Sequence, residues 1–105
     1  MLIISKRDIG HEAYCDENGK KCLLGHVFSA YGIPESLLKE SPSGSILYNR
    51  ITHPLVKKNL FRITGAGNYI LNSDATYIVE RNNAADYDEA AARLTDLGIT
   101  TIIVP

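Results

Sequence analysis

The sequence has no tryptophan, only two cysteines and no long apolar run, and these shortages exclude whole classes of protein. Two cysteines in 105 residues are too few for a disulfide scaffold, and a reducing compartment would keep them as thiols. The longest apolar runs, Met1–Ile4 and Ile99–Val104, are far shorter than the roughly 18 residues that a membrane span needs. The charged residues Lys6, Arg7 and Asp8 end the first apolar run early, so we expect no signal peptide and a cytoplasmic location.

An excess of either sign of charge is also missing. Eleven Lys and Arg residues stand against twelve Asp and Glu, which leaves a formal net charge of −1. No broad electrostatic field therefore favours a nucleic acid or an anionic membrane, and neither is an expected partner. With 45% apolar and 22% charged residues, the composition is that of a globular protein. A length of 105 residues predicts one domain, residues 1–105.

The spacing of apolar residues predicts an α+β fold. Helical periods cover Leu23–Tyr31, Pro34–Glu40, His53–Phe61 and Tyr87–Leu97. Strands are predicted at Met1–Ile4, Ala13–Cys22, Tyr69–Leu71, Thr76–Val79 and Ile99–Val104, with Asn72-Ser-Asp74 as a turn. We expect the first and last strands to be neighbours. The prediction is a single small domain with an antiparallel or mixed sheet of about four strands covered by two to four helices, able to fold without a metal.

The segment Ala13–Cys22 has the pattern of a β-hairpin. Asn18-Gly19 is the preferred pair for a two-residue type I′ turn. Folding about this pair sets Glu17 opposite Lys20 and Asp16 opposite Lys21, so two pairs of opposite charge favour the same register.

Four residues that can bind metals lie close together in the sequence: His11, Cys15, Cys22 and His26. On a hairpin followed by a helix they form a weak candidate zinc site, although structural zinc ligands usually lie two to four residues apart. Buried thiols explain the cysteines more simply, and a disulfide across the hairpin is a further alternative. A reactive Cys22 beside His26 would need an ionised thiolate, which burial opposes. We expect no cofactor and no catalytic residue.

The segment Thr64–Asn68 resembles a phosphate-binding glycine turn but completes neither a dinucleotide fingerprint nor a P-loop. A tight bend between strands explains its glycines more simply. The alternative is a small-ligand site built from this turn and the polar residues after it: Thr64, Gly65, Gly67, Asn68, Asn72 and Asp74.

Two further stretches carry a resemblance to known proteins. Gly19-Lys-Lys-Cys22-Leu-Leu-Gly25 is followed by Gly32 and Pro34, and Asn82-Asn83 precedes the segment Tyr87–Leu94. The chain thereby resembles a widespread group of small, largely uncharacterised proteins of phages and bacteria. That resemblance implies a phage or mobile-element origin, and with it the host cytoplasm as the location.

Six tyrosines against two phenylalanines suggest a surface that a partner covers, because tyrosine is enriched where a surface is wet alone and buried in a complex. We expect the partner-binding residues where aromatic and cationic side chains mix and the apolar period is weak. They are Tyr48, Arg50, His53, Lys57, Lys58 and Tyr69. A solvated helix face beside a flexible loop is the simpler explanation of the same residues.

The sequence therefore predicts a non-catalytic protein-interaction module, specifically a phage-encoded inhibitor of a host protein such as a defence or CRISPR component. The alternative is a small-ligand or nucleotide-binding protein, or a small enzyme, that uses the Thr64–Asn68 turn. Self-association is left open.

Overall fold

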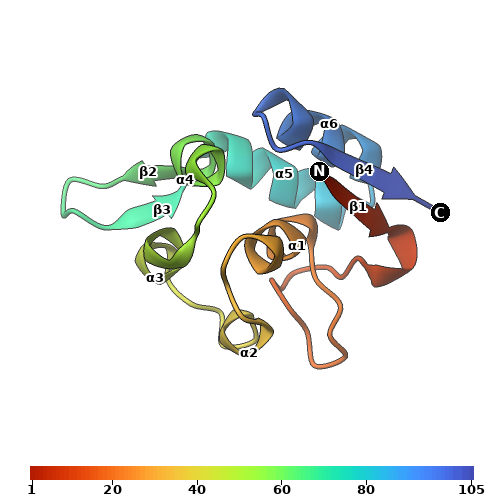
Figure 1. Ribbon diagram of the computed structural model, residues 1–105, viewed down its shortest axis with the longest axis horizontal. Coiled ribbons are helices and arrows are strands. Elements are labelled where there is room, and N and C mark those ends of the chain that lie inside the picture. Colours follow the sequence, from red (N-terminus) through yellow and green to blue (C-terminus); the bar gives the residue numbers. More distant parts are fainter.

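The computed structural model describes residues 1–105 and has the expected α+β class, with short strands at two ends of a mostly helical body (Figure 1). The helices are α1 (Leu23–Ala30), α2 (Glu35–Leu38), α3 (Gly44–Arg50), α4 (Pro54–Leu60), α5 (Ser73–Asn83) and α6 (Tyr87–Asp96), and a short 3₁₀ turn covers Lys6–Asp8. The strands are β1 (Leu2–Ser5), β2 (Phe61–Ile63), β3 (Tyr69–Leu71) and β4 (Thr101–Val104). None of the helices has the length and apolarity to span a membrane.

The four strands form two separate pairs rather than one sheet. The expected neighbours β1 and β4 pair in parallel, with Leu2 beside Thr101 and Ser5 beside Val104. The other pair, β2 and β3, is an antiparallel hairpin that projects from the opposite end of the molecule (Figure 1). Six helices, rather than two to four, fill the space between the pairs.

The predicted hairpin at Ala13–Cys22 is wrong, because no strand forms there. A turn does occur at Gly19, with a φ of +81°, but the Asp16 carboxylate accepts hydrogen bonds from the amides of Asn18 and Lys20, both at 2.9 Å. These bonds hold a tight local loop in place of two extended strands. The Lys21 ammonium lies 3.5 Å from the Glu35 carboxylate on α2 instead of facing Asp16.

The strand predicted at Thr76–Val79 is also wrong, since these residues lie inside helix α5. Asn72, assigned to a turn from the sequence, is the N-cap: its side-chain oxygen accepts a hydrogen bond from the amide of Ala75 at 2.9 Å. Ala75, Ile78 and Asn82 lie on the buried face at helical spacing. One member of that buried set is polar, which hides the helical period in the sequence.

The helices expected around residues 23–31, 34–40, 53–61 and 87–97 are present as α1, α2, α4 and α6. Helix α3 was not expected. The hydroxyl group of Ser43 caps it by accepting a hydrogen bond from the amide of Ile46, and Leu47 is its buried residue. One continuous core joins these elements, with Phe28, Leu47, Leu60 and Leu94 among its fully buried side chains.

Asn82 is the buried polar residue that ties the first part of the chain to this core. Its side-chain oxygen accepts a hydrogen bond from the amide of Leu23 at 2.9 Å, and its side-chain nitrogen donates to the carbonyl of Gly10 at 3.0 Å. Leu23 opens α1, so this amide has no partner within its own helix. Asn82 and Leu23 are both inaccessible to solvent, and water cannot replace the lost bond.

We expect Asn82→Ala to lower the free energy of unfolding by about 3 kcal/mol, because it leaves a buried amide and a buried carbonyl without partners. Urea denaturation followed by circular dichroism measures the change. Asn49→Ala, at an exposed asparagine of α3, is the matched control and should change stability by less than about 0.5 kcal/mol. Equal effects of the two substitutions would show that the Asn82 bonds contribute nothing specific.

Candidate functional site

Two of the predicted partner-binding residues form a stacked aromatic pair. The rings of Tyr48 on α3 and Tyr69 on β3 lie 3.6 Å apart between centroids and within 6° of parallel. The edge of the pair packs on the core, since the Tyr48 ring meets Phe61 at a centroid distance of 5.7 Å and an angle of 79°. Both tyrosines are half-buried, so the stack is held in place while part of it stays in contact with water.

Helix α3 and the hairpin approach each other closely, and this contact creates the stack. A Cβ atom added at Gly44 would lie only 2.2 Å from the carbonyl oxygen of Tyr69, so a glycine is needed at this position. The next residue, Ser45, accepts a hydrogen bond from the amide of Tyr69 at 2.9 Å. Ile63 is the cross-strand partner of Tyr69 and is 58% exposed, which extends the aromatic pair with an apolar side chain at the projecting end.

Helix α4 adds two lysines to the stack. The ammonium group of Lys57 lies 4.6 Å from the centroid of the Tyr48 ring. This cation–π contact orients the lysine side chain. Lys57 and Lys58 border a shallow groove of about 540 Å³, which is also lined by Tyr48, Ile51, Thr52 and Pro54. The interaction with the Tyr48 hydroxyl raises the pKa of Tyr69, and Lys57 acts in the opposite direction. We call Tyr48, Lys57, Lys58, Ile63 and Tyr69 the tyrosine surface.

The other two predicted partner-binding residues stand apart from this surface. His53 caps α4, where its Nδ1 atom accepts a hydrogen bond from the amide of Leu55 at 3.2 Å, and its ring packs on Tyr31 at 4.5 Å. Arg50 is exposed in the last turn of α3 and makes no hydrogen bond or ion pair with the stack. The structure therefore brings together Tyr48, Lys57, Lys58 and Tyr69, and gives His53 a structural role.

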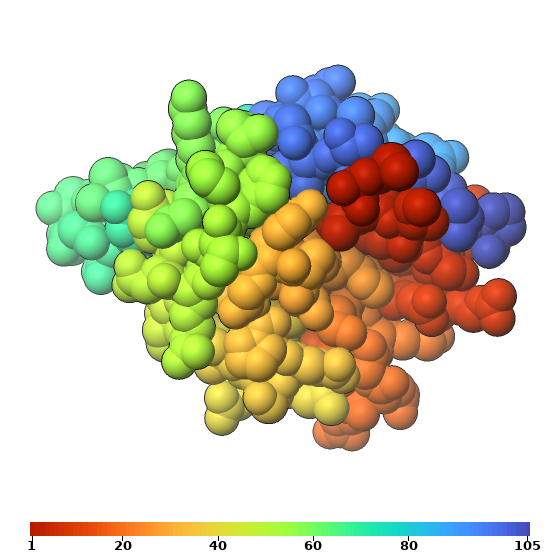
Figure 2. Space-filling model, viewed as in Figure 1, coloured from red at the N-terminus to blue at the C-terminus, as the bar shows by residue number.

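The absence of acidic residues around this surface was missed in the sequence, although its four cations are the one basic concentration of the chain. Residues 41–73 contain α3, α4, β2 and β3 and end at the first residue of α5; they include four cations and no Asp or Glu. All twelve acidic residues of the chain belong to the remainder, together with only seven cations. The near-zero net charge conceals this separation, which a running count of charge along the sequence would have found. We call residues 41–73 the basic lobe; they form one end of the molecule in Figure 2, from yellow-green to blue-green.

The weak zinc candidate is not assembled. His11 lies with its Nε2 atom 2.6 Å from the hydroxyl group of Tyr87, and the Nε2 atom of His26 lies 3.0 Å from the carbonyl of Asp8. Cys15 and Cys22 are buried free thiols. No group of three or more His, Cys, Asp or Glu side chains gathers in a way that could hold a metal ion.

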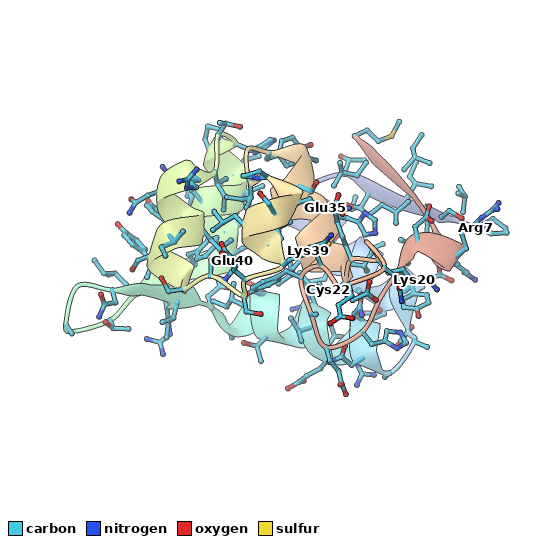
Figure 3. All side chains as sticks on the ribbon, turned by 90° about the horizontal axis from the view of Figure 1, so that it is seen from below. Arg7, Lys20, Cys22, Glu35, Lys39 and Glu40 are labelled. Carbon is cyan, nitrogen blue, oxygen red and sulfur yellow. The ribbon has the colours of Figure 1, made fainter.

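Cys22 has a structural position at the start of α1. Its sulfur accepts a hydrogen bond from the amide of Gly25 at 3.4 Å, as an N-cap does. Figure 3 labels Cys22 close to the loop that precedes the helix. Burial raises its pKa, and that of Cys15 as well. The Nε2 atom of His26 lies against the Asp8 carbonyl, and desolvation lowers the pKa of this imidazole. These directions oppose a thiolate and imidazolium pair.

The residues of the small-ligand alternative are also dispersed. The Thr64–Asn68 turn is the tip of the hairpin, where an added Cβ at Gly65 or Gly67 would meet nothing within 4 Å. Asn72 caps α5 and donates a hydrogen bond to the carbonyl of Asn59, while Asp74 pairs with Arg93 at 2.8 Å. A recess of about 450 Å³ does exist elsewhere, lined by Glu12, Ala13, Tyr14, Cys22, Ser41, Leu71, Val79 and Asn83. No feature of the sequence predicted this recess.

Comparison with known proteins found no relative. No protein-family model matches the chain, no curated protein is significantly similar to it, and no solved structure resembles its fold at a significant level.

The close approach at Gly44 can be tested with two glycine substitutions. We expect Gly44→Ala to lower the free energy of unfolding by about 1–3 kcal/mol, because its methyl group forces α3 away from Tyr69. Gly65→Ala, at the open tip of the hairpin, should change it by less than about 0.5 kcal/mol. Urea denaturation gives both values. If Gly44→Ala were as stable as Gly65→Ala, α3 and β3 would not be in the contact described.

Burial of both thiols predicts slow modification. At pH 8 we expect a disulfide reagent such as 5,5′-dithiobis(2-nitrobenzoate) to react at least about tenfold more slowly with the native protein than with the denatured chain. The reagent can reach the buried thiols only when the structure around them opens locally, and their raised pKa values lower the fraction of thiolate. Absorbance of the released thiolate measures both rates. Cys22→Ser leaves Cys15 as an internal control. If the native protein released one equivalent of thiolate rapidly on mixing, one of the cysteines would be exposed and reactive, and this prediction would be wrong.

Proposed function

We propose that this chain is a non-catalytic protein-interaction module and that the tyrosine surface contacts its partner. The observation that carries the proposal is the pre-formed stack of Tyr48 and Tyr69, with Lys57 oriented over it and Ile63 exposed beside it. Aromatic side chains that are already ordered lose little conformational entropy on binding, and tyrosine is among the residue types enriched in binding hot spots.

The placement of the reactive groups favours this proposal over an enzyme. Both thiols are buried, and Asp74, Asp86 and Glu89 contact neighbouring side chains: Asp74 pairs with Arg93, Asp86 with Arg81, and Glu89 accepts a hydrogen bond from Tyr77. A catalytic set needs a nucleophile or base directed at a common point, and these groups serve to join helices. Surface recognition is the activity that suits the remaining exposed residues.

The specific form of the proposal is a phage-encoded inhibitor of a host defence or CRISPR component. This form rests on the resemblance at Gly19–Gly25 and Asn82–Leu94 alone. A small protein acts as an inhibitor by covering a surface that its target needs. The end formed by α3 and the hairpin projects from the helical body (Figure 1) and is the end that we propose makes this contact.

Two exposed isoleucines at opposite ends of the molecule give a matched test. Ile63 lies beside the stack, and Ile3 lies on β1; they are 58% and 64% exposed. We expect Ile63→Ser to weaken binding to a captured bacterial partner by about 1–2 kcal/mol, roughly 5- to 30-fold, because it removes apolar contact area next to the aromatic anchor. Ile3→Ser should leave the affinity unchanged.

The partner is captured from bacterial lysate on the immobilised chain, identified by mass spectrometry, and then titrated as a purified protein against both variants by calorimetry. Loss of binding in Ile3→Ser but not Ile63→Ser would move the interface to β1. Failure to capture any stoichiometric partner, together with thermal stabilisation by a member of a nucleotide panel, would favour the small-ligand alternative.

A further inference from the structure

The charge of the molecule is separated between its two ends. The basic lobe carries Arg50, Lys57, Lys58 and Arg62 with no acidic residue, a formal charge of +4. The remaining 72 residues carry a formal charge of −5. The net charge of −1 therefore hides a large separation of positive and negative charge within the molecule. Figure 1 shows α3, α4 and the hairpin at one end, and Figure 2 shows the same segment as one continuous surface.

The cations of the basic lobe form no ion pair within the chain. The four ion pairs in the structure are Lys21–Glu35, Lys39–Glu35, Arg81–Asp86 and Arg93–Asp74, all outside the lobe. Figure 3 labels Glu35, the first residue of α2, close to Lys39, the residue that follows this helix. Three acidic residues, Glu35, Asp74 and Asp86, thus pair with cations outside the lobe, and the four cations of the lobe keep their charge free for an external partner.

Resting on the proposed function, we infer that the partner presents an acidic segment, with carboxylates next to an apolar side chain, and that this segment lies in the groove between α3 and α4. The groove is lined by Tyr48, Pro54 and the buried Ile51, and Lys57 and Lys58 border it. A carboxylate between the two lysines would be paired at both sides, while an adjacent apolar residue would pack on Pro54 and the half-buried Tyr48 ring. Complementary charge of this kind raises the association rate and selects the partner.

The same features favour a protein over a nucleic acid. Single-stranded nucleic acids bind by stacking bases on free aromatic faces, but the Tyr48 ring is already contacted by Tyr69, Phe61 and Lys57 of its own chain. A long polyanion would also extend past the lobe toward residues that carry a formal charge of −5, which repel it. Two lysines beside an apolar groove instead suit a short acidic stretch of polypeptide.

The test is an NMR titration of the ¹⁵N-labelled full chain with a defined probe, a random copolymer of glutamate and tyrosine. We expect chemical-shift changes at the amides of Tyr48, Ile51, Lys57 and Lys58, and an affinity that falls at least about tenfold when sodium chloride rises from about 0.05 to 0.5 M. The double substitution Lys57→Ala/Lys58→Ala should weaken binding at least about tenfold, and Lys58→Ala alone should weaken it measurably with an unchanged spectrum elsewhere.

The matched control is Lys6→Ala/Lys20→Ala, which removes the same charge from exposed lysines outside the lobe and should leave the affinity within about twofold. An equal loss in both double variants would overturn the inference, because attraction would then be unspecific. Shift changes outside the groove, or no binding of the copolymer, would also overturn it. Tighter binding of oligothymidylate at the same amides would assign the groove to nucleic acid instead.

Failure of this inference is distinguishable from failure of the proposed function. If a captured protein partner still binds Lys57→Ala/Lys58→Ala at high salt but loses affinity for Ile63→Ser, the interaction surface stands and its acidic partner chemistry is wrong. If the copolymer binds the groove but Ile63→Ser leaves the captured partner's affinity unchanged, the charge complementarity stands and the proposed contact with the stack is wrong.

Discussion

The buried side chain of Asn82 holds together parts of the chain that share no helix or sheet. It joins α5 to the first amide of α1 and to the loop at Gly10, and both bonds are closed to water. An apolar side chain of the same size would pack there but would leave two backbone groups without partners. The irregular segment before α1 is held on the core by this amide, together with the hydrogen bond that the amide of Glu12 donates to the side-chain oxygen of Asn83.

The elements that could be predicted are those in which one local signal dominates. Apolar residues at helical spacing located α1 and α6, with glycines at their ends, and β-branched runs located β1 and β4 and their adjacency. The wrong secondary-structure predictions occurred where the same short motif is compatible with two different local structures. Asn72-Ser-Asp74 is suited to a turn or to a helix start, and only the tertiary packing of Ala75 and Ile78 decides for the helix. Asn18-Gly19 likewise marks a turn, but Asp16 makes that turn part of a loop.

The candidate site shows the same division. Composition pointed to Tyr48, Lys57, Lys58 and Tyr69, and the fold brings these four together; their role in binding stays a prediction. The stack itself joins two residues 21 positions apart and depends on the absence of a side chain at Gly44, which no local pattern expresses. His53 was chosen for its chemistry and serves as a helix cap. Side-chain type identifies surface candidates, whereas contact geometry decides which of them act together.

The parallel pairing of β1 with β4 has a consequence for how the molecule folds. This ladder joins residues 2–5 to residues 101–104, so its formation closes a loop of almost the entire chain. Loop closure costs conformational entropy that grows with length, and two strands of four residues return few hydrogen bonds for it. The packing of β4 on α6 must come first, because it orders one of the two strands before the loop closes. We therefore expect the ladder to form last, and its backbone amides to exchange with solvent before those of α1 and α5.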